Sequence, residues 1–571
     1  MKKLNGILAL LLCLLFLVPT LASCGKKTPD ATTAASTTAD GEQEASSSET
    51  EAMTTTDKWE TVGDEVTAYA ASDRTLRIQY DMYVSAENVP QNNKYVQGPD
   101  ELIAGTTSSI EEKVYHRNRD AAEKFGLTLE YAQWDDLSWG RQAERIRTLV
   151  DGHDPDAPDL FIDMLYDLNK AMKTSGVFKD ITSIPGGFFD FEADGWMTEW
   201  MKSLSFTEDR AYILGGDYFL ELFRAMGVMP FNVDLMDANA TKLAAAIIEE
   251  DDELGANEKL SVRFFDLVEQ DDWTWDVLSK LSVAMWIDTD GDGANSFGDM
   301  LGIVVDRYTG LPGSLIVYST GIQLTETYTI ADENSEYYNK KWVRYYDNSA
   351  LLGSIFDAVA GVFSGPGAFV TNFNPDSGKT LQEHYTKFSE DTLLFAGPVV
   401  LGALENESFQ TMVSTWSVVP LPKVNAEQHY NTVIHNIADV GAISVNTTPD
   451  KARALSAYLQ YCNENSGKIR EEFQQVVTKY KTTTYNQGTS RMLDLIYANV
   501  ISGRDKALED VAEETSGKSS ASWMKAQGFT GTSAYVASQY ESQLSGKQAK
   551  LDKILEKWYS FSTSASETPA E

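Results

Sequence analysis

The stretch AAEKFGLTLEY, residues 121–131, joins a helical pattern to a strand pattern through one glycine. Across residues 111–125, apolar side chains recur at the spacing of one helical face. Gly126 supplies the stop that commonly ends a helix. Apolar and polar residues then alternate over 127–131, as they do in a half-buried strand. This stretch therefore predicts a helix that ends at Gly126 and leads directly into a strand.

The segments on either side continue the same alternation. Residues 76–80 and 160–162 have strand patterns, and a second helical pattern covers residues 139–150. Strand, helix, strand, helix and strand in succession favour parallel pairing with right-handed crossovers, so we predict an α/β lobe. Ligands on such sheets bind beyond the carboxyl ends of the strands. Three loops lie there: those at Asp81, at Trp134 and at residues 163–167.

Composition limits the classes of function. The chain has 571 residues, of which 42% are apolar, enough for a large core divided among more than one domain. It has 85 acidic and 47 basic residues and a net charge of −38, which repels nucleic acids and anionic lipids. Three cysteines are too few for a disulfide framework. A secreted enzyme, a binding protein and an adhesion module remain.

Residues 1–23 have the pattern of a signal peptide. Two lysines precede the apolar run 7–18, which is too short to span a bilayer comfortably. Residues 21–25, Leu-Ala-Ser-Cys-Gly, resemble the bacterial lipobox. The resemblance implies cleavage before Cys24 and acyl chains such as palmitate on the mature N-terminus. An ordinary signal peptide that happens to be followed by a cysteine is the alternative.

Residues 24–58 are dominated by Thr, Ser, Ala, Asp and Glu. Such a segment cannot bury enough apolar surface to offset its ordering entropy, so we predict a disordered linker between the anchor and the folded body. Residues 562–571 have a similar composition and are predicted to be a disordered tail. The lipid anchor is then the one membrane contact we expect.

One loop has the spacing of a metal site. Residues 288–299, DTDGDGANSFGD, place oxygen donors at the positions of a twelve-residue calcium loop, and Gly293 permits its sharp turn. Asp299 replaces the usual bidentate Glu, which lowers the expected affinity for Ca²⁺. The alternative is an Asp/Gly turn capped by its own side chains. The candidate ligands are Asp288, Asp290, Asp292, Ala294 through its carbonyl, Ser296 and Asp299.

The order of motifs resembles the extracellular solute-binding lipoproteins of bacterial ABC importers, in particular the carbohydrate-associated family 1 group. The motifs that carry this resemblance are residues 122–130, 157–161, 178–181, 229–235, 273–276, 288–302 and 418–422. Pro230 departs from the family pattern of its segment. Each motif is weak alone, but together they follow the family order over most of the folded body.

The resemblance implies two α/β lobes of the type II periplasmic-binding-protein fold, joined by crossing hinge segments. The N-terminal lobe is expected to contain residues 72–226 and 392–446. The C-terminal lobe is expected to contain residues 227–391 and 447–561. A sugar or oligosaccharide would be captured between the lobes and delivered to the permease subunits, and we expect a monomer that binds no nucleic acid.

Flat aromatic side chains suit the apolar faces of a neutral sugar, and Asp or Asn side chains suit its hydroxyls. By family position, the resemblance implies these substrate-binding residues: Trp134, Asp163, Asp167, Asp217, Tyr218, Trp416 and Asn436. For each of the aromatic residues, packing in the core is the alternative.

We assign no catalytic residues and expect no enzyme. Neither His-Glu-x-x-His nor Gly-x-Ser-x-Gly occurs, and the five histidines show no metal spacing. A lipid-tethered polysaccharide hydrolase or lyase is the alternative function, because a pair of carboxylates at the catalytic distance cannot be recognised from sequence alone. A structural adhesin, which would lack an enclosed cleft, is a further alternative.

Overall fold

The predicted strand, helix and strand around Gly126 occur in the computed structural model as α4 (Ser109–Phe125) and β2 (Thr128–Trp134). Ser108 and Glu111 form a capping box at the start of α4. Gly126 ends the helix with a φ of 60°, the left-handed conformation that glycine adopts without steric cost. The sequence prediction for this stretch is confirmed.

The structure describes residues 58–69, 73–81, 94–105, 107–134, 140–174, 176–206, 210–248, 252–307, 310–372, 383–477, 484–512 and 519–565. The predicted signal peptide, Cys24 and almost all of the predicted linker lie outside these residues. The C-terminal helix continues to Ala565 and so extends into the predicted 562–571 tail.

The first sheet is the α/β arrangement that the sequence predicts. Its strands, in spatial order, are β12 (Asp439–Ile443), β3 (Leu160–Met164), β1 (Thr75–Asp81) and β2. β1 pairs in parallel with β2 and β3, whereas β12 runs antiparallel to β3. Every residue of β3 and β12 is buried, as expected for strands covered on both faces.

The second sheet is formed by later segments. Its strands, in order, are β10 (Val399–Val400), β4 (Gly227–Asn232), β9 (Leu393–Ala396), β5 (Leu301–Asp306) and β8 (Ala368–Thr371), and β11 (Trp416–Val419) also pairs with β4. A separate hairpin is formed by β6 (Thr325–Thr329) and β7 (Lys341–Tyr345). Two α/β sheets are therefore present, and the predicted fold class is confirmed.

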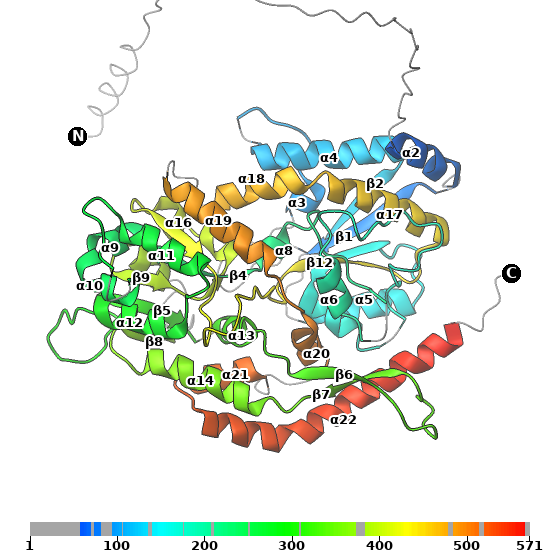
Figure 1. Cartoon of the computed structure of the whole chain (residues 1–571). Coiled ribbons are helices and arrows are strands. Elements are labelled where there is room, and N and C mark those ends of the chain that lie inside the picture. Colours follow the sequence, from blue (N-terminus) through cyan, green and yellow to red (C-terminus); the bar gives the residue numbers. More distant parts are fainter. Residues whose placement is uncertain are drawn as a thin grey trace, which may run out of the picture. The chain divides into compact units, whose positions relative to one another are not determined.

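Helices surround both sheets (Figure 1). The earlier ones are α2 (Lys58–Tyr69), α3 (Lys94–Gln97), α5 (Arg141–Asp151), α6 (Leu165–Ala171), α7 (Thr198–Ser203), α8 (Glu221–Arg224), α9 (Val233–Ala238), α10 (Ala240–Leu243), η1 (Ala244–Ala246), α11 (Leu260–Glu269), α12 (Trp275–Met285) and α13 (Leu311–Tyr318). The later ones are α14 (Ser349–Phe363), α15 (Glu383–Ser389), η3 (Leu401–Glu405), α16 (Glu407–Thr411), α17 (Pro449–Glu464), α18 (Gly467–Val477), α19 (Thr484–Ala498), α20 (Arg504–Ala512), α21 (Ser520–Ala526) and α22 (Ser533–Ala565).

The strand pairing differs from the predicted lobe boundaries in two places. β9, β10 and β11 lie within the segment 392–446 assigned to the N-terminal lobe, yet they pair with strands of the second sheet. α17 lies within the segment 447–561 assigned to the C-terminal lobe, yet it packs against α4 and α2. An apolar strand pattern records burial but does not record which sheet the strand joins, and that is the physical reason for the difference.

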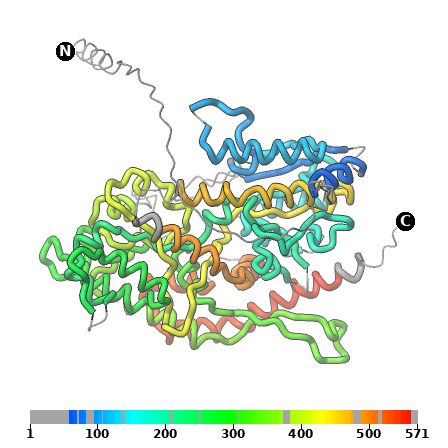
Figure 2. The backbone as a smooth tube through the Cα atoms, turned by 45° about the horizontal axis from the view of Figure 1, so that its top comes forward, coloured from blue at the N-terminus to red at the C-terminus, as the bar shows by residue number. Residues whose placement is uncertain are grey.

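Several late helices connect the two sheets. α18 contacts α4 at one end and η3 near the second sheet, and Figure 2 shows it running on from α17 toward α19. α22 packs along α14 and β7, and its Trp558 Nε1 donates a hydrogen bond to Met172 O beside the first sheet. α17 carries Cys462, the free cysteine among the described residues, whose thiol is buried. Burial raises the pKa of that thiol to about 12.

Three segments cross between the sheets, and hydrogen bonds join them side by side. The first crossing, at residues 225–227, leads into β4, and the second, at residues 432–435, leads back toward β12. Gly227 N of the first donates to Val433 O of the second at 3.0 Å, and His435 N of the second donates to Ala225 O of the first at 2.9 Å. The third crossing joins the same ladder, because Thr432 N donates to Asn499 O at 2.8 Å. The predicted crossing segments are therefore present, and they are joined to one another by backbone hydrogen bonds.

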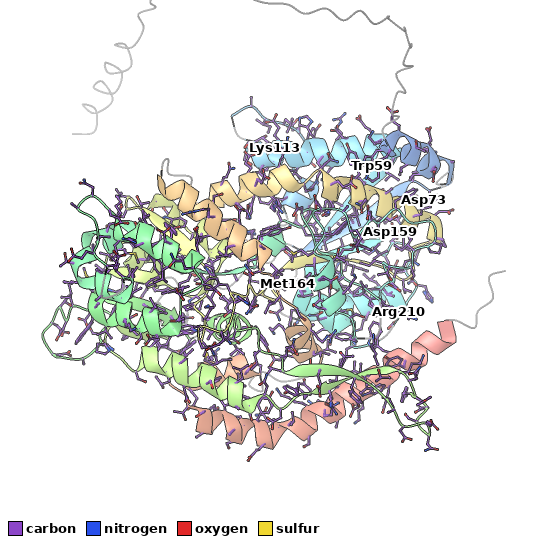
Figure 3. The ribbon with its side chains drawn as sticks, viewed as in Figure 1. Trp59, Asp73, Lys113, Asp159, Met164 and Arg210 are labelled. Carbon is purple, nitrogen blue, oxygen red and sulfur yellow. The ribbon has the colours of Figure 1, made fainter. Side chains whose placement is uncertain are left out.

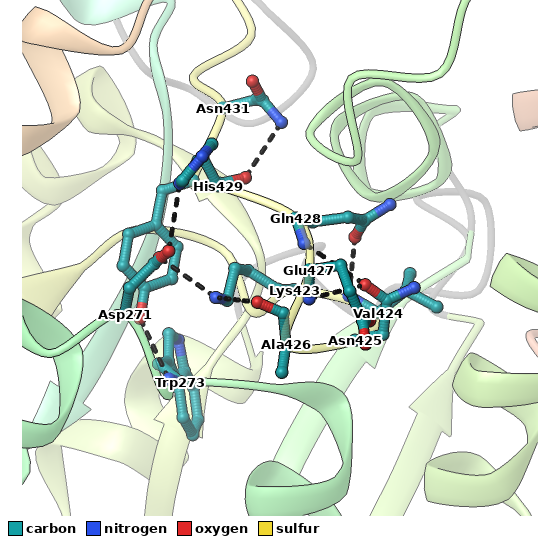
Figure 4. Close-up of polar contacts among 11 residues, drawn as sticks. Asp271, Trp273, Lys423, Val424, Asn425, Ala426, Glu427, Gln428, His429 and Asn431 are labelled. Atoms are coloured by element: carbon teal, nitrogen blue, oxygen red, sulfur yellow. Dashed lines mark hydrogen bonds and ion pairs between the residues drawn. The ribbon is translucent and has the colours of Figure 1, made fainter.

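A buried lysine fixes the turn that leads into the second crossing (Figure 4). Lys423 Nζ lies 3.1 Å from Asp271 Oδ1, and its side chain is only 1% exposed. The other Asp271 oxygen lies 3.1 Å from His429 Nδ1. Tyr430 closes the cluster, because its hydroxyl accepts a hydrogen bond from Trp273 N. The segment 423–430 is thus held against the start of α12 by a paired buried charge.

A buried ion cluster lies next to the first crossing. Arg224 Nη1 donates to both Glu221 carboxylate oxygens, at 2.8 and 2.7 Å. Its Nε and Nη2 donate to the two Glu405 oxygens, each at 3.0 Å. Glu221 belongs to α8, before the crossing, and Glu405 belongs to η3, beyond it. One guanidinium therefore links residues on both sides of the crossing.

We predict that Arg224→Met lowers the free energy of unfolding by about 3–5 kcal/mol, because it leaves the Glu221 and Glu405 carboxylates without their counter-ion. Urea unfolding followed by circular dichroism measures this loss. Lys280→Met is the control, because Lys280 pairs with Asp276 on the surface, where an ion pair contributes little. Equal unfolding midpoints for the two variants would contradict the prediction.

Candidate functional site

The carboxyl end of the first sheet holds a buried acidic cluster. Asp163 Oδ2 accepts a hydrogen bond from Gln79 Nε2 at 3.2 Å, and its Oδ1 accepts one from Met164 N at 2.9 Å. Burial raises the pKa of Asp163, and the negative charges of Asp81 and Asp167 raise it further. Burial also raises the pKa of Asp439, on the adjacent β12. The predicted residue Asp163 is therefore enclosed among polar neighbours.

Asp167 has a structural role in α5. Its Oδ1 accepts a hydrogen bond from Ala143 N at 3.0 Å, and its Oδ2 accepts one from Gly140 N at 3.2 Å. A carboxylate at this end of a helix satisfies backbone donors that have no intrahelical acceptor. Burial raises the pKa of Asp167, and these backbone hydrogen bonds oppose the rise. Its carboxylate is therefore used in positioning α5.

Trp134 and Asn436 are also held by protein partners. The Trp134 ring is 6% exposed, and the Arg145 guanidinium lies 3.8 Å from its centroid. Asn436 Nδ2 donates to Asp510 Oδ1 at 2.8 Å. The same carboxylate accepts hydrogen bonds from Asn169 and Lys506, so Asn436 belongs to a network that joins the second crossing to α6 and α20.

Tyr218 and Trp416 pack in the core. Tyr218 has no exposed surface, and the Arg117 guanidinium lies 4.5 Å from its ring centroid. Trp416 lies on β11, and its Nε1 donates to Phe409 O at 3.1 Å. Both aromatic rings therefore occupy the core positions that the sequence analysis keeps as the alternative. Their assignment as ligand contacts stays a prediction.

Asp217 is the predicted residue that lines a large cavity. The cavity has a volume of about 750 Å³, within the range of small-molecule sites. Segment 191–200 lines one side, and the end of α17, the start of α18 and the end of α19 line the other. Its aromatic and polar side chains include Phe191, Trp196, Trp200, Asp217, Asn463, Arg470 and Tyr497, and four further carboxylates, those of Glu192, Asp194, Glu199 and Glu464, also line it.

The Asp217 carboxylate is held by two side chains that also line the cavity. Arg470 Nη1 lies 3.2 Å from its Oδ1, and the Tyr497 hydroxyl donates to the same oxygen at 3.3 Å. Burial raises the pKa of Asp217 to about 6, although Arg470 opposes the rise. Gly195, at a φ of 94°, brings the aromatic segment against this group, and its carbonyl accepts a hydrogen bond from Asp217 N.

Three buried donor atoms belong to residues that line this cavity and have no acceptor among the described residues. They are Trp200 Nε1, Asn463 Nδ2 and Arg470 Nε. A buried donor without an acceptor costs free energy, so almost all such groups in proteins are paired with protein, water or ligand. These three atoms have almost no exposed surface, so they lie behind the cavity wall and mark lining residues whose hydrogen bonding is incomplete among the described residues.

The sequence analysis singled out only Asp217 among these lining residues. Trp196 and Trp200 belong to an aromatic-rich segment without regular periodicity, and Arg470 and Tyr497 come from helices far along the chain. The density of aromatic residues in 188–200, a segment that contains Gly195, was a signal that could have indicated a ligand-binding segment. No spacing rule could have joined that segment to α18 and α19.

The predicted calcium loop brings three of its carboxylates together. One oxygen each of Asp288, Asp290 and Asp292 lie within 4.8 Å of one another. The Asp288 oxygens accept hydrogen bonds from Gly291 N and Gly293 N, which wraps the backbone around this carboxylate. The hard oxygen atoms of these three carboxylates suit Ca²⁺.

Other candidate ligands of that loop are occupied by the loop itself. Asp299 Oδ1 accepts from Thr289 N at 3.0 Å, and its Oδ2 accepts from Ser296 N at 2.8 Å. The Asp288, Asp290 and Asp292 carboxylates also accept backbone hydrogen bonds within the loop. Because oxygens of these three come within 4.8 Å of one another, they fit the ion better than the full predicted set.

Comparison with known proteins finds likenesses of structure alone. No family model matches the chain, and no curated protein matches it. One similar structure is the GacH receptor of Streptomyces glaucescens, solved unliganded and with acarbose, at 11% identity and a TM-score of 0.44 over 85% of this chain and 99% of that chain. Another is a family 1 extracellular solute-binding protein from Bifidobacterium longum subsp. infantis, at 14% identity and a TM-score of 0.44 over 84% and 99% of the two chains.

A third is the galacto-N-biose/lacto-N-biose I-binding protein of the ABC transporter from Bifidobacterium longum, at 11% identity and a TM-score of 0.43 over 85% of this chain and 98% of that chain. In the present chain, two α/β sheets joined by three crossing segments define the fold. Among the described residues, no helix combines the length and the apolar character needed to cross a membrane.

We predict that Asp217 makes stability depend on pH. Its pKa rises from 3.8 to about 6 on folding, so between these pH values the folded protein holds more protons than the unfolded chain. The stabilising contribution of this group is therefore present below pH 3.8 and is lost as the pH rises to about 6, by up to about 3 kcal/mol.

Asp217→Asn should lack this loss, because an amide does not titrate. Urea unfolding of both proteins across this pH range measures the difference between them. Asp156→Asn is the control, since the Asp156 side chain is 87% exposed and should leave the wild-type pH profile unchanged. Parallel profiles for the wild type and Asp217→Asn would refute the assignment.

Proposed function

We propose that this chain is the substrate-binding lipoprotein of an ABC importer that captures a sugar or oligosaccharide and delivers it, chemically unchanged, to the membrane permease. The observation that carries the proposal is the cavity at Asp217 with its three unpaired buried donors. The motif order in the sequence supports the same class of protein.

The lining of the cavity suits a neutral polyhydroxylated molecule. Sugar hydroxyls both donate and accept hydrogen bonds, so they can accept from Trp200, Asn463 and Arg470 and donate to Asp217. The Phe191 and Trp200 rings offer flat apolar surface for the C–H faces of a sugar. The negative charge of Asp217 is paired with the positive charge of Arg470. The other charged lining residues are all acidic, namely Glu192, Asp194, Glu199 and Glu464, and they disfavour an anionic ligand.

The crossing segments suit a binding mechanism by closure. All three run beside one another in a single hydrogen-bonded ladder, which places the hinge of a rotation between the two sheets at these segments. The helices α18 and α22, which contact both regions, would shift with such a rotation. The cavity includes Ala498 and Val500, at the third crossing, and so adjoins this hinge. A ligand stabilises the closed state only through contacts that it makes in the closed state and lacks in the open state.

The proposal includes attachment to the outer face of the cell membrane through lipidated Cys24, with the linker 24–58 between anchor and folded body. It also includes docking of the closed monomer on the permease subunits. Mass spectrometry of the mature N-terminal peptide tests the anchor, since an unmodified cysteine, or cleavage elsewhere, would exclude it.

We predict that calorimetry against a panel of neutral oligosaccharides finds at least one saturable ligand. Trp200→Phe and Arg470→Gln should each weaken its binding by about tenfold, because each removes a donor to the ligand. Trp523→Phe is the matched control, because Trp523 is also a buried tryptophan with an unpaired Nε1 but lines a different and smaller pocket.

Chromatography of the same mixtures separates capture from turnover. Intact ligand after prolonged incubation supports transport, whereas cleaved ligand would support the alternative of a lipid-tethered hydrolase or lyase. If Trp523→Phe weakens binding as much as Trp200→Phe does, the ligand does not bind in the Asp217 cavity.

We also propose that the 288–299 loop binds Ca²⁺ as a structural ion, through the Asp288, Asp290 and Asp292 carboxylates. An ion there would offset the repulsion among these carboxylates, and the loop lies outside the residues that line the Asp217 cavity.

The calcium proposal predicts that Ca²⁺ raises the melting temperature of the chelator-treated protein in a concentration-dependent way, because the ion binds the folded state. Asp290→Asn combined with Asp292→Asn should abolish the rise. Asp332→Asn, in another exposed acidic turn, should preserve it. A melting temperature that is indifferent to Ca²⁺ would leave the loop as a self-capped turn.

A further inference from the structure

A second cavity is lined by Thr182, by Lys202, Ser205, Phe206 and Arg210, by the hairpin β6–β7, and by Arg504 at the start of α20. Its volume is about 550 Å³, again within the range of small-molecule sites. It shares no lining residue with the cavity at Asp217. Neither the sequence motifs nor the proposed function assigns it a role.

The register of the hairpin determines which side chains face this cavity. Thr329 pairs with Lys341, and side chains alternate between the two faces of a ribbon, so Thr327, Thr329 and Lys341 share one face. All three line the cavity. Trp342 points the other way and stacks on Tyr559 of α22, with 5.6 Å between the ring centroids. The hairpin thus presents two hydroxyls and an ammonium group to the cavity, while its other face packs against α22.

The charge of the lining is opposite to that of the chain. Its charged side chains are Lys202, Arg210, Lys341 and Arg504, and none of the described lining residues is acidic. The whole chain has 85 acidic and 47 basic residues, so a cationic lining is contrary to its composition. Figure 3 places Arg210 on the side of the first-sheet region that faces α22 and the hairpin.

Two of these cations, Arg504 and Lys202, are only weakly compensated. Arg504 Nη1 donates to Thr327 Oγ1 at 2.6 Å, and its Nε donates to Ser203 O at 3.4 Å. Both acceptors are neutral, so these bonds supply no counter-ion, and the adjacent Asp505 interacts with Arg504 only through its charge. Lys202 pairs with Glu199 at 3.1 Å, but both side chains are more than half exposed, and such a pair contributes little and exchanges readily.

We propose that this second cavity binds a small solute that carries an oxyanion, namely a carboxylate, sulfate or phosphate group. Guanidinium groups bind such anions through paired N–H donors, which makes Arg504 and Arg210 suitable partners. The hydroxyls of Thr327 and Thr329 add neutral donors beside them. This site is separate from the Asp217 cavity, whose described lining has five acidic residues and one basic residue, Arg470.

Calorimetry with the mature protein tests the proposal, with inorganic phosphate and glucuronate as anionic probes and glucose as the neutral match. We expect saturable binding of at least one anion that weakens as the salt concentration rises. Arg504→Gln and Lys341→Gln should each weaken this binding by about tenfold. Binding of phosphate alone indicates a free inorganic anion, whereas stronger binding of glucuronate indicates an acidic sugar.

Two matched variants test whether the anion binds in this cavity. Arg119→Gln removes an exposed arginine on α4, and Arg470→Gln alters the first cavity, so both should leave anion binding unchanged. Glucose binding, wherever it occurs, should not respond to Arg504→Gln. The proposal is overturned if neither anion binds, if Arg119→Gln weakens binding as much as Arg504→Gln, or if Arg470→Gln abolishes it.

Discussion

The structure depends on the way the chain crosses between its two sheets. Three crossings come together in one ladder of backbone hydrogen bonds, although their residues are separated by about half of the chain. Arg224 lies beside this ladder and is shared between a carboxylate before the crossing and one after it. A buried cation holds two anions in place only while the geometry is maintained, so the crossing also fixes the neighbouring helices.

The polar groups near both candidate ligand positions are only partly satisfied by the fold. At the carboxyl end of the first sheet, Asp163, Asp167 and Asn436 find partners within the protein and position helices and strands. The acceptor atoms Gln79 Oε1, Asn169 Oδ1 and Asp439 Oδ1 are buried there without a hydrogen-bond partner among the described residues. Around Asp217, buried donors remain without acceptors among the described residues. A polar group that the fold already satisfies contributes to architecture, whereas an unsatisfied one in a cavity has interaction energy left for a ligand.

The first sheet could be predicted because its signals are local. Helix spacing, one glycine stop and strand alternation around residues 121–131 determine neighbouring elements, and their succession implies parallel pairing. The second sheet mixes parallel and antiparallel strands from distant segments, so the membership of β9 to β11 could not be read from pattern. The lining of the Asp217 cavity could not be predicted for the same reason, because only tertiary packing brings Arg470 and Tyr497 next to Asp217.

Cys462 illustrates a consequence of packing for thiol chemistry. Its thiol lies inside α17 with no exposed surface, and a pKa of about 12 keeps it almost entirely protonated at neutral pH. Only the thiolate attacks disulfides or reacts rapidly with oxidants. The buried Cys462 sulfhydryl is therefore protected from oxidation, whereas an accessible one could cross-link copies of the chain or be oxidised to sulfenic acid.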